Sequence, residues 1–203
     1  MMKNLMIALF LILGFSIHSF SQEFKGGVYA GIIGSQVAGD NLSGYNKAGV
    51  DLGVFTQLSI SDKFSLQMEL AYMMKGSQKN PDKKNNFSYK LHTSYIQIPI
   101  LAQFEIIPNF RIEAGIAGAV LISSYEEKDA MELISKDSFN SFSLSFIGGV
   151  SYQINERFKI AILTNNDLTS VKKRTFYGMG VRRIGEKRGQ YNDLLSLRLY
   201  LNI

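Results

Sequence analysis

Apolar and polar residues alternate with a period of two along most of the chain beyond residue 22. The alternation is clearest from Phe64 to Tyr72, where every even-numbered residue is large and apolar. Since successive side chains of a β-strand point to opposite faces, this pattern predicts strands with one apolar face. Eight such segments are expected, at 24–34, 48–60, 64–72, 96–106, 110–113, 142–146, 158–165 and 195–203.

The connections between these segments alternate in length. Tight turns are expected at 61–63, 108–109 and 155–156, and long polar connections at 36–47, 77–90, 124–138 and 169–190. Short periplasmic turns and long outward loops are typical of bacterial outer-membrane barrels. The sequence therefore predicts an all-β fold, an eight-stranded antiparallel up-and-down transmembrane β-barrel.

The N-terminal segment has the three-part layout of a secretory signal peptide. Lys3 precedes an unbroken apolar run from Leu5 to Phe15, and small residues follow at Ser19 and Ser21. The run of about 11 apolar residues is too short for a membrane helix, which needs roughly 20. We expect a cleaved signal peptide at 1–21 and one barrel domain at 22–203. The chain has no cysteine, which excludes lipoprotein acylation, disulfides and thiol chemistry.

A soluble eight-stranded barrel is the main structural alternative. The less apolar face of the strands distinguishes it from a membrane barrel. A soluble barrel would turn a charged face to water. Here the second face carries mostly small residues, among them Gly27, Gly31, Gly49, Gly53, Gly115, Ala117, Ala119, Ser143, Ser145, Gly149 and Ser151. Small residues suit the narrow interior of eight strands, so the pattern favours the membrane barrel.

Charged residues of both signs also fall on this second face. They are Lys25, Asp51, Glu69, Lys75, Glu105, Arg111, Glu113, Lys159 and Arg198. We expect a lumen charge network of Asp51, Glu69, Glu105, Arg111, Glu113, Lys159 and Arg198, with Glu69 or Glu113 paired to Arg111 or Arg198. Side chains can fill so narrow a lumen, so little or no conductance is expected. A narrow channel for small solutes is the alternative.

Three stretches resemble signatures of the PorT-like outer-membrane β-barrel family. Residues 68–76 resemble its "ELxYxxKG" strand, 94–102 its "xYLEIPLLxK" and 113–118 its "EAGPYxG". The seventh strand departs from the family's "RYxxGL", and the chain ends in Ile203 instead of an aromatic residue. The resemblance implies an integral outer-membrane protein handled by the barrel-assembly machinery. Some family members serve secretion or gliding machinery.

Candidate catalytic and metal-binding residues are sparse. His92 and Ser94, followed by Glu105, resemble the His-x-Ser plus acid arrangement of outer-membrane lipid A deacylases, in which a histidine-activated serine cleaves an acyl ester. Glu105 is at an odd-numbered position, whereas His92 and Ser94 are at even-numbered ones, so Glu105 should face the lumen and not its two partners. We therefore expect no enzyme. A lipid A-modifying esterase is kept as the alternative. The acidic residues of 126–137 are interspersed with lysines, which is typical of a solvated loop and not of a calcium site. Residues 40–41 and 165–167 have the composition of turns. No metal or cofactor is therefore expected.

The last long connection is strongly basic. Its cations are Lys172, Lys173, Arg174, Arg182, Arg183, Lys187 and Arg188, against Glu186 alone. Interleaved with Phe176 and Tyr177, they form a possible anion-binding loop for lipopolysaccharide phosphate. A solvated loop with no ligand is the alternative.

These patterns predict a non-enzymatic outer-membrane protein with a filled lumen. It would act as a structural or interaction component of the envelope, for instance as a subunit of a secretion-type complex. The expected partners are outer-membrane lipid, lipopolysaccharide, the barrel-assembly machinery and envelope-complex proteins. The net charge of +5 is too modest to indicate nucleic acid.

Overall fold

The computed structural model describes residues 24–40, 42, 44–81, 87–129, 131–132, 139–172, 180–181, 183 and 189–203. The predicted signal peptide at 1–21 lies outside these residues. The described residues form eight long strands and one short one: β1 (Phe24–Ala38), β2 (Lys47–Ser59), β3 (Phe64–Lys79), β4 (Tyr89–Ile107), β5 (Phe110–Lys128), β6 (Met131–Glu132), β7 (Phe142–Gln153), β8 (Phe158–Asp167) and β9 (Tyr191–Asn202).

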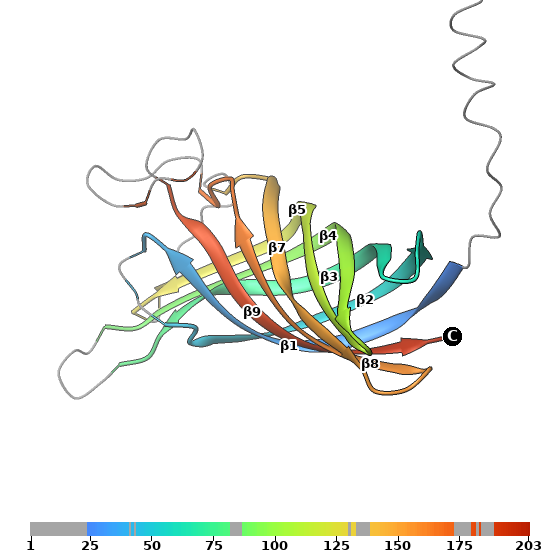
Figure 1. Ribbon diagram of the computed structural model, residues 1–203. Coiled ribbons are helices and arrows are strands. Elements are labelled where there is room, and N and C mark those ends of the chain that lie inside the picture. Colours follow the sequence, from blue (N-terminus) through green and yellow to red (C-terminus); the bar gives the residue numbers. More distant parts are fainter. Residues whose placement is uncertain are drawn as a thin grey trace, which may run out of the picture.

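The eight long strands form a closed antiparallel barrel (Figure 1). The pairing order is β4-β3-β2-β1-β9-β8-β7-β5, and β4 pairs with β5 to close the sheet. The two-residue β6 pairs only with the end of β5. Closure gives each of the eight long strands a partner on both sides, so these strands can satisfy their backbone groups within the sheet, as a structure in lipid must. The predicted fold class is therefore confirmed.

Alternating strand faces separate a polar interior from an apolar exterior. On β3, Gln67 and Glu69 are almost fully buried, whereas Met68 and Leu70 between them are each 51% exposed. Large apolar side chains point outward from every long strand, where membrane lipid covers them. In the part of the chain that the structure describes, no helix is long and apolar enough to cross a membrane.

The three tight turns lie where the sequence predicts them. Phe64 O accepts hydrogen bonds from the backbone of Ile60 and Ser61, and Asn109 adopts the left-handed conformation with φ 69°. Asn155 caps its turn by accepting from the backbone N–H groups of Arg157 and Phe158. These turns define the periplasmic end of the barrel, and the long connections define its outer end.

The strands extend further toward the outer end than the alternation predicted. β3 continues to Lys79, β4 begins at Tyr89 and β5 continues to Lys128. Parts of the predicted connections 77–90 and 124–138 are therefore strand. Beyond the lipid layer the outward face need not be apolar, so the alternation fades while the backbone ladder continues.

A register shift in the β4–β5 pair changes which face β5 presents near its outer end. Ser94 pairs with Ser123 but Tyr95 pairs with Leu121, so Ile122 is an extra residue in β5. Such a bulge shifts the side-chain parity of the strand beyond it. It is the reason why odd-numbered residues of β5 face the lumen below the bulge, whereas Glu126 is buried above it.

Candidate functional site

The interior of the barrel is the most elaborate polar site of the described chain, and Arg198 on β9 is its centre. Its Nε atom donates to Asp51 Oδ2 at 2.6 Å, and its Nη1 atom donates to Glu69 Oε2 at 3.0 Å. The Tyr200 hydroxyl donates to Glu69 Oε1 at 2.9 Å. Gly31 leaves room for this cluster, because a Cβ there would lie 3.0 Å from Arg198 Cγ. Buried charges need such partners, since each has lost its water.

The cluster continues toward the periplasmic end through amides and a second cation. Lys159 Nζ on β8 donates to Gln67 Oε1 at 2.9 Å and lies 3.6 Å from Glu113 Oε1. Gln103 Nε2 also donates to Gln67 Oε1, and Gln67 Nε2 donates to Glu69 Oε1 at 2.5 Å. Side chains from β2, β3, β4, β5, β8 and β9 thus meet in one buried network that spans the lumen.

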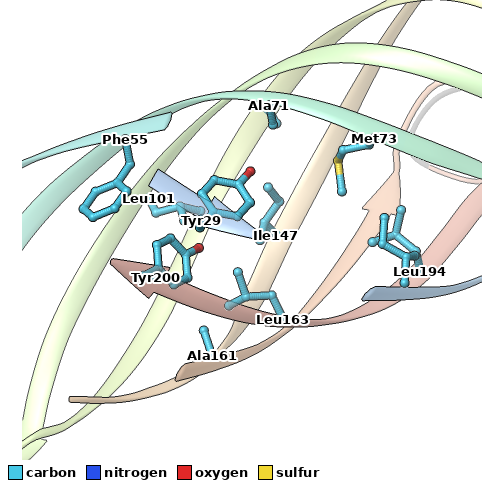
Figure 2. Packing of buried hydrophobic residues seen from close by; sticks show 12 residues of the cluster. Tyr29, Phe55, Ala71, Met73, Leu101, Ile147, Ala161, Leu163, Leu194 and Tyr200 are labelled. Atoms are coloured by element: carbon cyan, nitrogen blue, oxygen red, sulfur yellow. The ribbon is translucent and has the colours of Figure 1, made fainter. Parts of the chain in front are cut away.

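Aromatic rings fill the remaining space around this network. The Tyr29 and Tyr200 ring centroids are 4.8 Å apart, and the Phe55 ring stands edge-on to Tyr200 at 5.3 Å (Figure 2). Lys159 Nζ lies 4.2 Å from the centroid of the Tyr200 ring. Gly53 provides the space for Tyr29, because a Cβ at residue 53 would lie 2.7 Å from the tyrosine ring.

An apolar layer follows toward the outer end of the barrel. Its members come from five strands and are almost fully buried: Ile33, Met73, Ile147, Leu163 and Leu194. In Figure 2, Met73 and Leu194 lie away from the aromatic group of Tyr29, Phe55 and Tyr200. This layer separates the Arg198 network from a second polar group above it.

The second polar group joins Lys75 on β3 to Asp167 on β8. Lys75 Nζ lies 3.2 Å from Asp167 Oδ1, and neither side chain is exposed. Asn192 Nδ2 donates to Asp167 Oδ2 at 2.9 Å. The prediction that 165–167 is a turn is wrong, because β8 continues through Asp167 and turns its carboxylate into the lumen.

Side chains from two connections pack into the outer end of the barrel. Phe139 and Val171 pack on Val37 of β1 and Leu91 of β4 in a small buried apolar cluster. Lys172 Nζ donates to Glu126 Oε1 at 2.7 Å. Residues beyond the ends of β5 and β8 are thus attached to the barrel wall.

The structure describes two cations of the predicted anion-binding loop, Lys172 and Arg183. Arg183 Nη2 contacts Asp193 Oδ2 at 2.6 Å, and its Nη1 donates to the backbone carbonyl of Asp167 at 2.7 Å. Both cations are therefore paired with acids of the barrel. The other loop cations lie outside the described residues: Lys173, Arg174, Arg182, Lys187 and Arg188.

At the periplasmic end the lumen opens into a polar cavity of about 410 Å³. Arg111 lines it and contacts Glu105 at 3.2 Å, with both side chains about a quarter exposed. The prediction that Arg111 pairs with Glu69 or Glu113 is therefore wrong for this residue. The Arg198–Glu69 pair does form, and Glu113 lies nearest to Lys159.

The three residues of the esterase alternative do not meet. His92 and Ser94 share the outward face of β4, and Ser94 Oγ accepts a hydrogen bond from the Tyr72 hydroxyl at 3.1 Å. Glu105 is 11 residues further along the same strand, or roughly 36 Å at 3.3 Å per residue, and is paired with Arg111. Within the described ranges, no three acidic or histidine side chains gather as a metal site.

Sequence reasoning missed several members of the lumen network, chiefly neutral ones. Gln67, Gln103 and Tyr200 carry no formal charge, so a search for charged residues passed over them. Their odd or even position within each strand could have identified them, because they share the parity of Glu69, Glu105 and Arg198.

Comparison with known proteins assigns this fold to a family. The family described as "Outer membrane protein beta-barrel domain" matches residues 13–169. No curated protein matches the chain. Among solved structures, Neisserial surface protein A is 12% identical, with 89% of this chain and 97% of that chain covered and a TM-score of 0.57. Ail, the attachment invasion locus protein of Yersinia pestis, is also 12% identical, with 89% and 99% covered and a TM-score of 0.48.

At this identity the likeness to Neisserial surface protein A concerns the fold, and the family match supplies the classification. The match covers more than half of the chain and includes the strands from β1 to β8. The chain belongs to the outer membrane protein beta-barrel domain family and is an eight-stranded protein of the outer membrane.

Proposed function

We propose that this protein is a non-enzymatic, non-conducting outer-membrane barrel that serves as a structural and interaction component of the envelope. The filled lumen carries this proposal. Three successive layers occupy it: the Arg198 network, the apolar layer around Met73, and the Lys75–Asp167 group. An ion would have to displace buried side chains in every layer, ion-paired or hydrogen-bonded in two of them and packed apolar groups in the third.

The apolar layer is the strongest barrier to charge movement. The Arg198 network and the Lys75–Asp167 group could each hold a proton or an ion. Between them, Ile33, Met73 and Leu163 offer no hydrogen-bonding side chain, and the polar side chains beside them, such as Gln97 and Ser196, are neutral. Transfer of a charge across such a layer has a high free-energy cost, because few neutral groups there can replace its hydration.

The strands that project from the membrane offer a surface for interaction. β4 and β5 each contain 19 residues, whereas a tilted membrane strand needs about 9–11. The outward apolar residues of β4 run from Ile96 to Ile106, so the excess lies toward the outer end. A rigid sheet that extends beyond the lipid is a suitable platform for a protein partner.

The resemblance to the PorT-like family extends the proposal to membership of a secretion-type complex. The residues that carry it are barrel residues, with Glu69 and Glu113 inside the lumen network. The partner surface would therefore be formed by the projecting strand ends, the outer connections or the periplasmic turns.

In-cell crosslinking tests this proposal. A small affinity tag inserted between Pro81 and Phe87 allows recovery of the barrel from crosslinked outer membranes. A stoichiometric envelope protein in the eluate supports the proposal. Recovery of the barrel with lipid alone, from cells that fold it normally, contradicts its role in a complex.

A further inference from the structure

Asn165 on β8 has an amide side chain that makes no hydrogen bond within the described residues. The residue is 1% exposed, and both its Oδ1 and its Nδ2 atom are buried without a partner. On the lumen face of β8 it lies between Leu163 of the apolar layer and Asp167 of the second polar group. A polar group buried without a hydrogen bond loses its hydration and gains nothing in exchange, which is costly. The amide of Asn165 therefore needs a partner that the surrounding side chains do not supply.

Two more amides in the outer half of the lumen have an atom without a partner among the described residues. These atoms are Gln97 Oε1 on β4 and Asn192 Oδ1 on β9, and neither side chain is exposed. Most buried side-chain polar atoms in folded proteins have at least one hydrogen-bond partner. Three incompletely bonded amides from three strands therefore call for a common explanation.

Contacts and ladder positions bring the three amides together. Gln97 Nε2 donates a hydrogen bond to Ser145 Oγ on β7 at 3.4 Å. By the registers of the β7–β8 and β8–β9 pairs, Asn165 is a diagonal neighbour of Ser145 on one side and of Asn192 on the other. Diagonal neighbours on one face of a sheet are about 7–8 Å apart. Amides at these positions are close enough to be bridged by one or two small hydrogen-bonding molecules.

The wall beside these amides consists of small residues. Ala117 and Ala119 on β5 pair with Ser145 and Ser143 on β7, and Ala119 is also the ladder partner of Gln97. All four small side chains are buried on the lumen face. Side chains of one or two heavy atoms do not reach across the lumen, so they leave room beside the longer amides.

The chemistry of these groups selects a small neutral molecule that both donates and accepts hydrogen bonds. Asn165 offers a donor and an acceptor, while Gln97 Oε1 and Asn192 Oδ1 are acceptors. The nearby Lys75 and Asp167 neutralise each other at 3.2 Å, so a bound ion would bring an uncompensated charge. An apolar molecule would leave the amides unpaired. Water donates and accepts, and a buried water molecule typically makes about three hydrogen bonds to otherwise unpaired groups.

We propose that the outer half of the lumen binds a cluster of ordered water molecules that bridges Asn165, Gln97 and Asn192. The cluster lies on the outer side of Leu163 and Leu194, so the ordered water of this half of the lumen ends at the apolar layer. The site is distinct from the ion-paired Arg198 network. It does not rest on the proposed function, because a barrel with or without a partner protein has to satisfy these amides.

Nuclear magnetic resonance of the refolded mature chain in detergent micelles tests the proposal directly. The Nδ2 protons of Asn165 should show cross-relaxation with water, which differs in sign from chemical exchange in the rotating frame. Methyl protons of Leu101, which is not exposed and belongs to the apolar lining of the lumen, supply the baseline.

Replacement of Asn165 by leucine distinguishes a hydrated site from a dry one by the sign of the stability change. If water bridges the amides, Asn165→Leu displaces it and leaves Gln97 and Asn192 unpaired. The folding equilibrium constant from urea titration should then fall about tenfold or more. Asn166→Leu makes the same chemical change on the opposite face of β8 and should alter this constant by less than about threefold.

Absence of water cross-relaxation at the Asn165 Nδ2 protons above the Leu101 baseline would overturn the proposal. A rise in the folding equilibrium constant of Asn165→Leu would do the same, since it would show an unsatisfied amide in a dry site. The resonance measurement uses the unsubstituted protein, so it decides the question even if Asn165→Leu does not fold. Folding of each protein is first checked by its altered gel migration before and after heating.

Discussion

Arg198 and Asp51 are 147 positions apart in the chain, yet the Arg198 Nε atom donates a 2.6 Å hydrogen bond to Asp51 Oδ2 in the middle of the barrel. Their strands, β9 and β2, do not pair with each other, because β1 lies between them. The contact is possible because Gly31 on β1 has no side chain to fill the space. The pair therefore ties β9 to β2 over β1 on the lumen side of the wall, in addition to the hydrogen bonds of the sheet.

Replacement of Arg198 by methionine should destabilise the barrel strongly. Arg198→Met leaves Asp51 and Glu69 buried without their cation, and such a loss has a cost of about 3–5 kcal/mol. Urea unfolding in phospholipid vesicles measures the change. Addition of Asp51→Asn and Glu69→Gln should recover most of it. A loss below about 1 kcal/mol for Arg198→Met alone would contradict this stabilising role.

Gly53 should tolerate no side chain. In Gly53→Ala the new Cβ would lie 2.7 Å from both the Tyr29 ring and the Leu70 carbonyl oxygen, so a loss of about 1–3 kcal/mol is expected. Gly118→Ala is the control, because its Cβ would lie 3.5 Å from Phe142 and should change stability by about 0.5 kcal/mol or less. Equal unfolding midpoints for the two variants would refute this packing.

The Lys75–Asp167 pair should also depend on both partners. Asp167→Asn keeps the shape of the side chain but leaves the unexposed Lys75 ammonium without its counterion, which should lower stability by about 3–5 kcal/mol. Asp129→Asn, in a connection at the outer end, keeps its acceptor for the Ser88 N–H and should change stability by about 0.5 kcal/mol or less. Indistinguishable unfolding curves would show that Lys75 does not need this partner.

The sequence was sufficient to predict the architecture because lipid constrains one face of every strand. Met68 and Leu70 must be apolar, so the period-two pattern around Glu69 is strong and the strand count follows from it. Beyond the lipid that constraint ends. The outer ends of β3 and β4, at Lys79 and Tyr89, were therefore expected to be loop although they are paired.

The pairing of the lumen side chains is harder to predict than their position on the inner face. Parity places Arg198 and Arg111 on the same face, but pairing depends on height and on position around the barrel. Arg111 lies at the periplasmic mouth beside Glu105, whereas Arg198 reaches the acids of β2 and β3. Asp167 was assigned to a turn because Asn-Asn-Asp is a common turn sequence, and nothing local indicates that Lys75 is its partner.

Ser94 should prove structural and not catalytic. Ser94→Ala removes the acceptor of the Tyr72 hydroxyl and should lower stability by about 1 kcal/mol. Mass spectrometry of lipid A from cells with either form of the protein should give the same acylation pattern. Loss of an acyl chain with the unsubstituted protein, and its retention with Ser94→Ala, would instead establish an esterase.

Single-channel recording of the folded, purified protein in planar bilayers tests the central claim most directly. The three lumen layers predict no stable open state at either polarity. The triple variant Met73→Ala, Leu163→Ala and Leu194→Ala, which thins the apolar layer, is the comparison that shows the assay can detect leakage. Absence of steps with the unsubstituted protein agrees with a plugged barrel, and a large, stable conductance with that protein would contradict it.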